Sequence, residues 1–415
     1  MKKLLLLTML LLSLLAIGAQ EVYVVNSSSM TLSKIDIEAG TVVNDFVQLG
    51  TTPNLIDVHE GFAYVVNSGD NSVQKIDLAT GSTVSNIYVA DSSNPWYAKA
   101  KDGFLYVTGF LSNKLYKISL DSEEVVAEVT VGEAPEGIEF YNDNIYVSCS
   151  GGYASGYAAS QVTVLSAIDL SEVAVIPTSL NPQYVHLANN KIYVSCTGNW
   201  VDIMGKVEVI DPLTNTITTT IEIGGNIGKV AFTGDRGYIS DAMNSGIYVI
   251  DTVNDVVIND SSNPLTPGGS TIATNGEIVA YVNASWGSNG TVWITDANLE
   301  NGVDFEVALA PTDIIFGTPS TSNDNNVQVA SLELSCYPNP TQDKVTFVLN
   351  SESKENHTLS IYNIKGQLVK EWSSFSSKVT WNGLDNNNNA TSNGVYFYSV
   401  KGDKRSTTGK FVRVK

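Results

Sequence analysis

The sequence predicts an all-β protein: a seven-bladed β-propeller with four-stranded blades and a shared closing blade, followed by a small immunoglobulin-like β-sandwich. The main observation is a motif of an apolar residue, a tyrosine and a valine or isoleucine that recurs seven times. Its tyrosines are Tyr23, Tyr64, Tyr106, Tyr146, Tyr193, Tyr238 and Tyr281. They are spaced by 41, 42, 40, 47, 45 and 43 residues. Further short apolar segments accompany each copy, and four strands in such a period are typical of propeller blades.

The phase of the repeat predicts how the ring closes. The first copy of the motif occupies the second-strand position of a blade, whereas the last apolar segment, at 311–316, occupies a first-strand position. We therefore expect this last segment to complete the blade that begins near residue 21. A ring closed in this way hides most sheet edges, which explains how such apolar strands stay soluble.

The N-terminal residues 1–19 have the pattern of a signal peptide. Two lysines precede an apolar run at 4–17, and the small residues Gly18 and Ala19 follow it. We expect cleavage after Ala19. No other stretch approaches the ~20 apolar residues of a membrane helix, so the mature chain is predicted to have no transmembrane span.

Composition and charge divide the remaining chain into a propeller at 20–317, a polar linker at 318–332 and a sandwich at 333–415. The sandwich region has 11 Lys and Arg against 7 Asp and Glu, or +4. The span 20–332 has 10 against 36, or −26. A body this acidic repels phosphate backbones, which argues against a nucleic-acid partner.

The repeats resemble the YVTN/YncE-type propeller family, which is associated with surface-layer and cell-surface repeat proteins. The resemblance lies in YVVNSGDNSVQKIDLATGSTV at 64–84 and APEGIEF at 134–140. It covers about 21–317 and implies the fold. It implies little about function, because propellers host many unrelated activities.

The region 333–415 resembles the type A sorting domain of the type IX secretion system. The matching pieces are YPNP at 337–340, LSIYNIKG at 359–366, WNG with Asp385 at 381–385, GVYFY at 394–398 and the basic end at 410–415. The resemblance implies passage to the periplasm, translocation by the type IX machinery and a secreted or outer-membrane-surface location. The alternative is an ordinary accessory β-sandwich.

The sequence has no recognised catalytic or metal-binding motif. Its three histidines lack zinc-site spacing, and no nucleophile elbow, P-loop, dinucleotide fingerprint or calcium loop is present. We therefore predict no metal and no cofactor. His357 is expected in an exposed turn. Cys149 and Cys196 occupy equivalent positions of adjacent blades, which predicts two buried free thiols, and Cys336 is expected to pack as a small apolar residue.

Four polar side chains are expected near the propeller axis, each four residues after a proline that opens a first strand: Asp57, Lys99, Glu139 and His186. This set could bind a ligand or perform acid–base chemistry. The alternative is a set of water-solvated groups that line a channel. A hydrolytic or lyase-type enzyme would use such groups, with Glu136, Glu139 and His186 as candidates.

A second candidate site is the face of the propeller that carries the loops before the first strands and between the second and third strands. The aromatic residues expected there are Trp96, Tyr97, Phe110, Tyr153, Tyr157, Tyr184, Trp200 and Trp286, with Met204 and Met243 beside them. The loops at 148–161 and 195–205 are the longest. We predict that this face recognises a ligand, although several of these rings could instead pack between blades.

The leading hypothesis is a secreted or cell-surface binding or scaffold protein that is not an enzyme. Some surface propellers that resemble this family capture corrinoids, which makes a corrinoid a candidate ligand. A glycan and a protein are equally compatible with the aromatic loops. The alternatives are a hydrolytic or lyase-type propeller enzyme and a structural surface-layer component.

Overall fold

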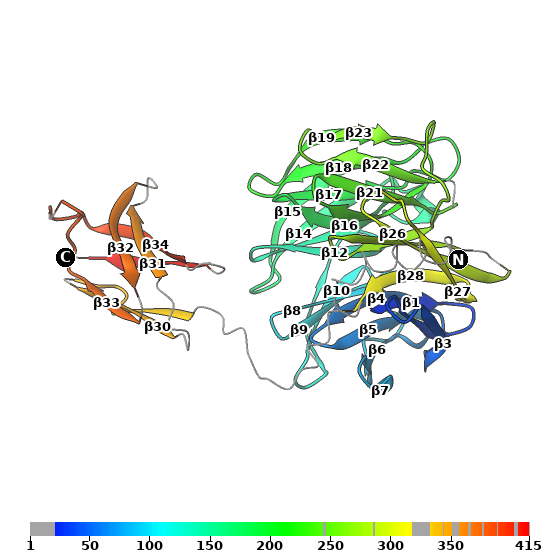
Figure 1. Cartoon of the computed structure of the whole chain (residues 1–415), viewed down its shortest axis with the longest axis horizontal. Helices are drawn as coiled ribbons and strands as arrows, with labels where there is room; N and C mark the ends of the chain where they lie inside the picture. Colours follow the sequence, from blue (N-terminus) through cyan, green and yellow to red (C-terminus); the bar gives the residue numbers. More distant parts are fainter. Residues whose placement is uncertain are drawn as a thin grey trace, which may run out of the picture. The chain divides into compact units, whose positions relative to one another are not determined.

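The computed structural model describes residues 21–243, 246–284, 287–317, 333–342, 344–350, 357–363, 367–375, 377–387, 389–401 and 406–414. The predicted signal peptide at 1–19, the linker at 318–332 and Trp286 lie outside the described residues. The chain forms two compact units, Met1–Ser320 and Thr321–Lys415 (Figure 1). The described residues form strands and two short 3₁₀ turns, η1 (Ser68–Asp70) and η2 (Tyr153–Ser155), which confirms the all-β class.

The first unit contains seven four-stranded antiparallel sheets within its described residues, here numbered blades 1 to 7. The innermost strands are β28 (Pro311–Phe316), β4 (Pro53–His59), β8 (Pro95–Lys101), β12 (Pro135–Tyr141), β16 (Pro182–Ala188), β20 (Ile227–Thr233) and β24 (Thr271–Thr274). The second strands are β1 (Glu21–Asn26), β5 (Phe62–Asn67), β9 (Phe104–Gly109), β13 (Asn144–Cys149), β17 (Lys191–Cys196), β21 (Arg236–Asp241) and β25 (Ile278–Asn283).

The outer half of each blade is formed by two more strands. The third strands are β2 (Thr31–Asp36), β6 (Ser72–Asp77), β10 (Lys114–Ser119), β14 (Gln161–Ser166), β18 (Lys206–Asp211), β22 (Ile247–Asp251) and β26 (Asn289–Asp296). The outermost strands are β3 (Thr41–Gln48), β7 (Ser82–Tyr88), β11 (Val125–Thr130), β15 (Glu172–Pro177), β19 (Thr216–Glu222), β23 (Val256–Asn259) and β27 (Val303–Leu309).

The innermost strands form a closed ring. Each contacts the innermost strand of the next blade, and the series returns from β24 through β28 to β4. The ring closes where β28 pairs antiparallel with β1, with Val24 opposite Ile314 (Figure 1, yellow beside blue). The segment 311–316 therefore completes the blade that begins at residue 21, and the unit is a β-propeller.

Burial follows the position of each strand within its blade. The second strand β9 is buried from Leu105 to Gly109, because both of its faces pack against neighbouring blades. The outermost strand β11 instead alternates between exposed and half-buried residues. Each hydrophobic cluster joins adjacent blades; one packs Leu115 of blade 3 against Ile138 of blade 4. Burial of these apolar side chains, at roughly 25 cal/mol per Å², is the main force that holds blades together.

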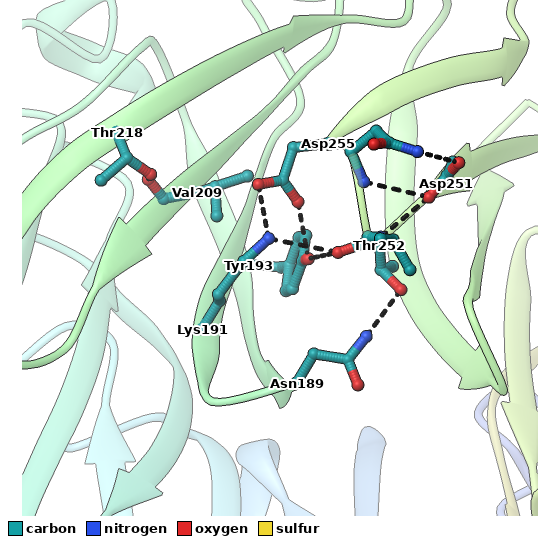
Figure 2. A network of polar contacts seen from close by, with 10 residues as sticks. Asn189, Lys191, Tyr193, Val209, Thr218, Asp251, Thr252 and Asp255 are labelled. Carbon is teal, nitrogen blue, oxygen red and sulfur yellow. Dashed lines mark hydrogen bonds and ion pairs between the residues drawn. The ribbon is translucent and has the colours of Figure 1, made fainter.

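The recurring tyrosine contacts the turn that follows the third strand of the next blade (Figure 2). In blade 6, Asp251 accepts hydrogen bonds from the backbone of Val253 and fixes the turn after β22. This turn presents the carbonyl of Thr252 and the carboxylate of Asp255. The Tyr193 hydroxyl of blade 5 donates to both, at 3.2 and 2.8 Å.

Two other tyrosines of the motif make the same contact with the next blade. Tyr146 donates to the carbonyl of Pro212 at 3.3 Å, and Tyr238 donates to the carbonyl of Ala297. The hydroxyl of Tyr281 has no hydrogen-bond partner within the described part of the chain. At these three interfaces the tyrosine of the repeat therefore combines apolar burial with a hydrogen bond across the blade interface.

We predict that Tyr193→Phe lowers the free energy of unfolding by about 1–2 kcal/mol, because it leaves the Thr252 carbonyl and the Asp255 carboxylate without this donor. Chemical denaturation of the purified protein measures the change. Tyr281→Phe is the matched control, and we expect it to alter stability by less than about 0.5 kcal/mol. Equal effects of the two substitutions would contradict the role assigned to the tyrosine hydroxyl.

The thiols of Cys149 and Cys196 are buried and free, as the sequence predicts, and Cys336 is half-buried against the core of the second unit. The Cys149 sulfur lies 3.7 Å from the Thr163 hydroxyl, and the Cys196 sulfur lies 3.9 Å from the carboxylate of Glu208. Burial raises the pKa of Cys149 to about 12 and holds the pKa of Cys196 well above its usual value. Both thiols therefore stay protonated and unreactive.

We predict that Cys149 and Cys196 do not react with the thiol reagent DTNB at pH 8 while the protein is folded. Addition of guanidinium chloride should expose them, so that all 3 cysteines of the sequence react. Absorbance of the released thiolate at both conditions provides the measurement and its internal control. Rapid reaction of either propeller cysteine in the folded protein would show that its interface opens.

The second unit is a β-sandwich. One sheet has the order β29 (Glu333–Tyr337), β30 (Val345–Asn350), β33 (Lys378–Trp381), and the other has the order β32 (Leu368–Phe375), β31 (His357–Asn363), β34 (Gly394–Lys401), β35 (Ser406–Arg413). Phe347, Trp381, Tyr396 and Phe411 pack in its core. His357 is buried at the start of β31, so the expectation of an exposed turn is wrong.

The short motifs of this unit have structural roles. Trp381 fills the core and donates from its indole nitrogen to the Leu384 carbonyl at 2.7 Å. Gly383 has a φ of +78°, and a Cβ there would lie 2.6 Å from the Arg413 guanidinium, which packs over the Trp381 ring. The Asp385 carboxylate accepts the Asn389 amide at 2.8 Å and fixes the following turn.

Candidate ligand-binding site

The axis of the propeller is lined by two layers of side chains from the innermost strands. The lower layer contains Asp57, Lys99, Glu139 and His186, the four residues that the sequence places near the axis. The upper layer lies two residues earlier on each strand and includes Tyr97, Tyr184, Lys229, Thr271 and Asp313. Alternate residues of a strand point to the same side, so both layers face the axis.

The lower layer is bonded to the backbone of the neighbouring blades. The Asp57 carboxylate accepts the Ala100 amide at 2.9 Å. Glu139 accepts the Leu187 amide at 3.3 Å and forms an ion pair with Lys99 at 2.8 Å. These acceptors satisfy amides along the free edges of the innermost strands, which water would otherwise have to reach.

His186 acts as an acceptor in the same arrangement. Its Nε2 atom accepts the Val230 amide at 3.2 Å. Burial, together with the positive charges of Lys229 and Lys99, holds the pKa of His186 well below its usual value. The imidazole is therefore neutral at pH 7, and its Nε2 lone pair is occupied, so this atom is not available as a general base.

The upper layer contains a buried ion pair that the sequence analysis missed. Lys229 and Asp313 are 2.8 Å apart, and Asp313 also accepts the Thr271 hydroxyl at 3.1 Å and the Ile56 amide at 3.2 Å. The two-residue periodicity of a strand could have identified both residues, because each precedes a lower-layer position by two.

Two tyrosines complete the upper layer. Tyr97 and Tyr184 are half-buried, and neither hydroxyl has a hydrogen-bond partner among the residues that the structure describes. Burial raises the pKa of both phenols, so they remain neutral donors. The Tyr184 ring stacks on His186 with centroids 6.2 Å apart and an interplanar angle of 8°.

Blade 4, which lies between the blades of these tyrosines, contributes only Gly137 at the same position. A Cβ at Gly137 would lie 2.9 Å from the carbonyl of Gln183, so the absence of a side chain lets β12 and β16 approach. The upper layer is thus interrupted between Tyr97 and Tyr184.

The longest connections between second and third strands, those of blades 4 and 5, meet through a pair of aromatic residues. The Trp200 indole donates to the Tyr157 hydroxyl at 3.1 Å. Tyr157 is buried and also contacts the ring of Tyr153, which is 79% exposed. Tyr157 and Trp200 have φ values of +63° and +65°, a left-handed conformation that costs roughly 1–2 kcal/mol for such residues.

Several apolar residues around Trp200 are exposed. Val201 is 78% exposed, and Ile203 and Met204 are 41% and 44% exposed in the same loop. Met243, in the corresponding loop of blade 6, is 65% exposed. Met204 and Met243 were expected on this face from the sequence, whereas Val201 and Ile203 lack the aromatic side chain that made the other loop residues candidates.

The aromatic residues of blade 3 are arranged differently. Trp96 and Phe110 are half-buried and stack on each other, with ring centroids 5.0 Å apart and an interplanar angle of 30°. Each ring therefore covers part of the apolar surface of the other.

A buried carboxyl group lies between the loops and the axis. Glu136 precedes Gly137 on β12 and is 4% exposed. Burial raises its pKa to about 8, an effect that the Ser150 hydroxyl opposes only in part. Glu136 lies within electrostatic range of both Tyr157 and Tyr184. We define the loop-face site as Tyr97, Glu136, Tyr153, Tyr157, Tyr184 and Trp200.

No cluster of three histidine, cysteine, aspartate or glutamate side chains that could hold a metal occurs in the described part of the chain. A pocket of about 380 Å³ lined by Phe104, Lys117 and Ile168 lies at the opposite ends of the strands and does not include the loop-face site.

Comparison with known proteins identifies the second unit. Residues 335–415 match the family of secretion system C-terminal sorting domains. This match indicates export, a secreted or cell-surface location, and interaction with the type IX secretion machinery. Curated protein sequences give no significant match. No helix among the described residues is long and apolar enough to cross a membrane.

The fold is similar to that of several solved structures. A chain of hydrazine synthase from Kuenenia stuttgartiensis has a TM-score of 0.52 and 17% identity, over 65% of this chain and 91% of that one. A chain of a mitotic checkpoint complex has a TM-score of 0.50 and 7% identity, over 64% and 83% of the two chains. At such low identities the likeness concerns the fold alone.

We predict that Glu136 makes stability depend on pH. Because its pKa is raised in the folded state, from 4.5 to about 8, the folded protein binds this proton more tightly than the unfolded chain. Stability should therefore fall as the pH rises from about 4.5 to about 8 and change no further above it, by about 1.4 kcal/mol per unit of pKa shift.

Melting curves of Glu136→Gln between pH 4 and pH 9 test this prediction. The variant does not titrate, so its melting temperature should lack this decrease and exceed that of the unsubstituted protein at pH 9. The exposed Glu133→Gln is the control and should reproduce the original profile. A Glu136→Gln profile that is the same as the original one would refute the assignment.

Proposed function

We propose that the protein is a secreted or cell-surface binding protein whose propeller recognises a ligand at the loop-face site. The observation that carries the proposal is the bond between Trp200 and Tyr157, which joins the long loops of blades 4 and 5. Aromatic and aliphatic side chains remain exposed around this bond. Exposed apolar groups on a loop face, held by a rigid scaffold, are typical of recognition surfaces.

The rest of the propeller favours binding over catalysis. The acid–base candidates Glu139 and His186 are hydrogen-bonded to backbone amides of the next blade. The Nε2 atom of His186 would have to lose its contact to act as a proton acceptor, and Glu139 is held further by its ion pair with Lys99. The two long loops, by contrast, have largely exposed side chains, among them Tyr153 and Val201.

The proposal includes a route to the cell surface. Residues 1–19 would direct the chain to the periplasm as a signal peptide, and residues 333–415 would direct it across the outer membrane. The linker at 318–332 would connect the propeller to the sorting domain. The YVTN/YncE-type resemblance of residues 64–84 and 134–140 is in keeping with this location.

A thermal-shift measurement on the purified chain tests ligand recognition. A corrinoid, a glycan mixture and calcium are the ligands to compare. A ligand that binds only the folded state stabilises it by about 2.7 kcal/mol at 100 times its dissociation constant. We expect Trp200→Ala to weaken such binding at least tenfold, since an aromatic anchor commonly contributes about 2 kcal/mol or more.

Tyr88→Ala is the control, because Tyr88 is exposed on the outermost strand of blade 2, outside the loop-face site. The proposed function requires that Tyr88→Ala retain the ligand while Trp200→Ala loses it. A ligand that binds both variants equally well would place recognition elsewhere on the molecule.

A further inference from the structure

The polar groups that remain free at the loop-face site are neutral. The hydroxyls of Tyr97 and Tyr184 have no partner within the described residues, and both phenols keep their protons because burial raises their pKa. The carboxyl group of Glu136 is hydrogen-bonded to the Ser150 hydroxyl, and burial raises its pKa to about 8. The two free phenols offer hydrogen bonds without a net charge.

The cations near the axis already have anionic partners. Lys99 is paired with Glu139 and Lys229 is paired with Asp313, each at 2.8 Å. An anionic ligand would therefore find no unpaired cation at this part of the axis. It would also have to approach an acidic body, which has a net charge of −26 over residues 20–332.

The polar groups and the aromatic rings of the site come from neighbouring blades. Tyr97 and Tyr184 lie at equivalent positions of β8 and β16, on either side of Gly137 of β12, and Glu136 precedes that glycine. Tyr157, in the long loop of blade 4, is bonded to Trp200 of blade 5. The site thus spans blades 3 to 5, from the upper layer to the two long loops.

We propose that the loop-face site binds a neutral saccharide chain, which extends from the tyrosines near the axis to the aromatic residues of the two long loops. A sugar ring has an apolar C–H face that packs on an aromatic ring. Its hydroxyl groups both donate and accept, and so pair with neutral phenols and carboxyl groups. The saccharide hydroxyls would meet Tyr97 and Tyr184, and the C–H faces would pack on Tyr153 and Trp200.

This assignment rests on the proposed function, because it names the ligand class of the same site. It differs from the proposed function, however, in that binding also requires the hydroxyl groups of Tyr97 and Tyr184. A ligand with a purely apolar surface would need only the aromatic rings of these residues. Recognition of a saccharide also needs the hydroxyl groups, since each would otherwise lose its water without a replacement.

Affinity electrophoresis of the intact chain tests the inference. Native gels contain dextran, soluble starch, laminarin or mannan as neutral polysaccharides, and alginate as an acidic one. We expect at least one neutral polysaccharide to retard the protein and alginate to leave its mobility unchanged. The double variant Tyr97→Phe with Tyr184→Phe keeps both rings, and we expect it to lose at least tenfold in affinity.

Tyr281→Phe, which removes a buried phenol in blade 7, is the matched control and should be retarded as strongly as the unsubstituted protein. No retardation in any neutral gel, or equal retardation of the double variant, overturns the inference. If Trp200→Ala abolishes binding of a corrinoid while the double variant retains it, the proposed function holds and the saccharide assignment fails. Retardation that survives Trp200→Ala as well as the double substitution refutes both.

Discussion

The pairing of β28 with β1 is the constraint on which the rest of the propeller depends. This antiparallel pair joins residues 22–26 to residues 311–316 and converts a row of seven blades into a ring. Ring closure gives every innermost strand a neighbour on each side. It also fixes the spacing between blades, so that the same contact, such as that of Tyr193 with Thr252, recurs at equivalent interfaces.

Closure creates a second requirement at the axis, where seven strand edges converge and expose backbone amides. Asp57, Glu139, His186 and Asp313 meet this requirement, because each accepts an amide of the following blade. Charges that would suggest catalysis in isolation are thus part of the architecture. The groups left over, among them the hydroxyls of Tyr97 and Tyr184, are the ones that a ligand could use, and for this reason we propose recognition at the upper layer and the loops.

The spacing of the recurring tyrosines was sufficient to predict the propeller and the role of residues 311–316, because each blade repeats the same burial pattern. The direction of individual side chains was harder to predict. The register of β8 and β9 shifts between Pro95 and Ala98, and in this irregular stretch Trp96 stacks on Phe110. Tyr97 was expected on the loop face, but it keeps the two-residue alternation with Lys99 and faces the axis. The two-residue periodicity of the strands places Lys229 and Asp313 at the axis, but the ion pair between them joins two different blades and cannot be predicted from the sequence of either strand.

The repeat also separates the loops that folding needs from those that need another explanation. The connections between the second and third strands are 4 or 5 residues long in blades 1, 2, 3, 6 and 7. The corresponding connections in blades 4 and 5 are 11 and 9 residues long and are bonded to each other through Tyr157 and Trp200. Joining the two strands does not require this length. The extra length and the exposed apolar surface are accounted for if these loops are shaped by the ligand that we propose for them.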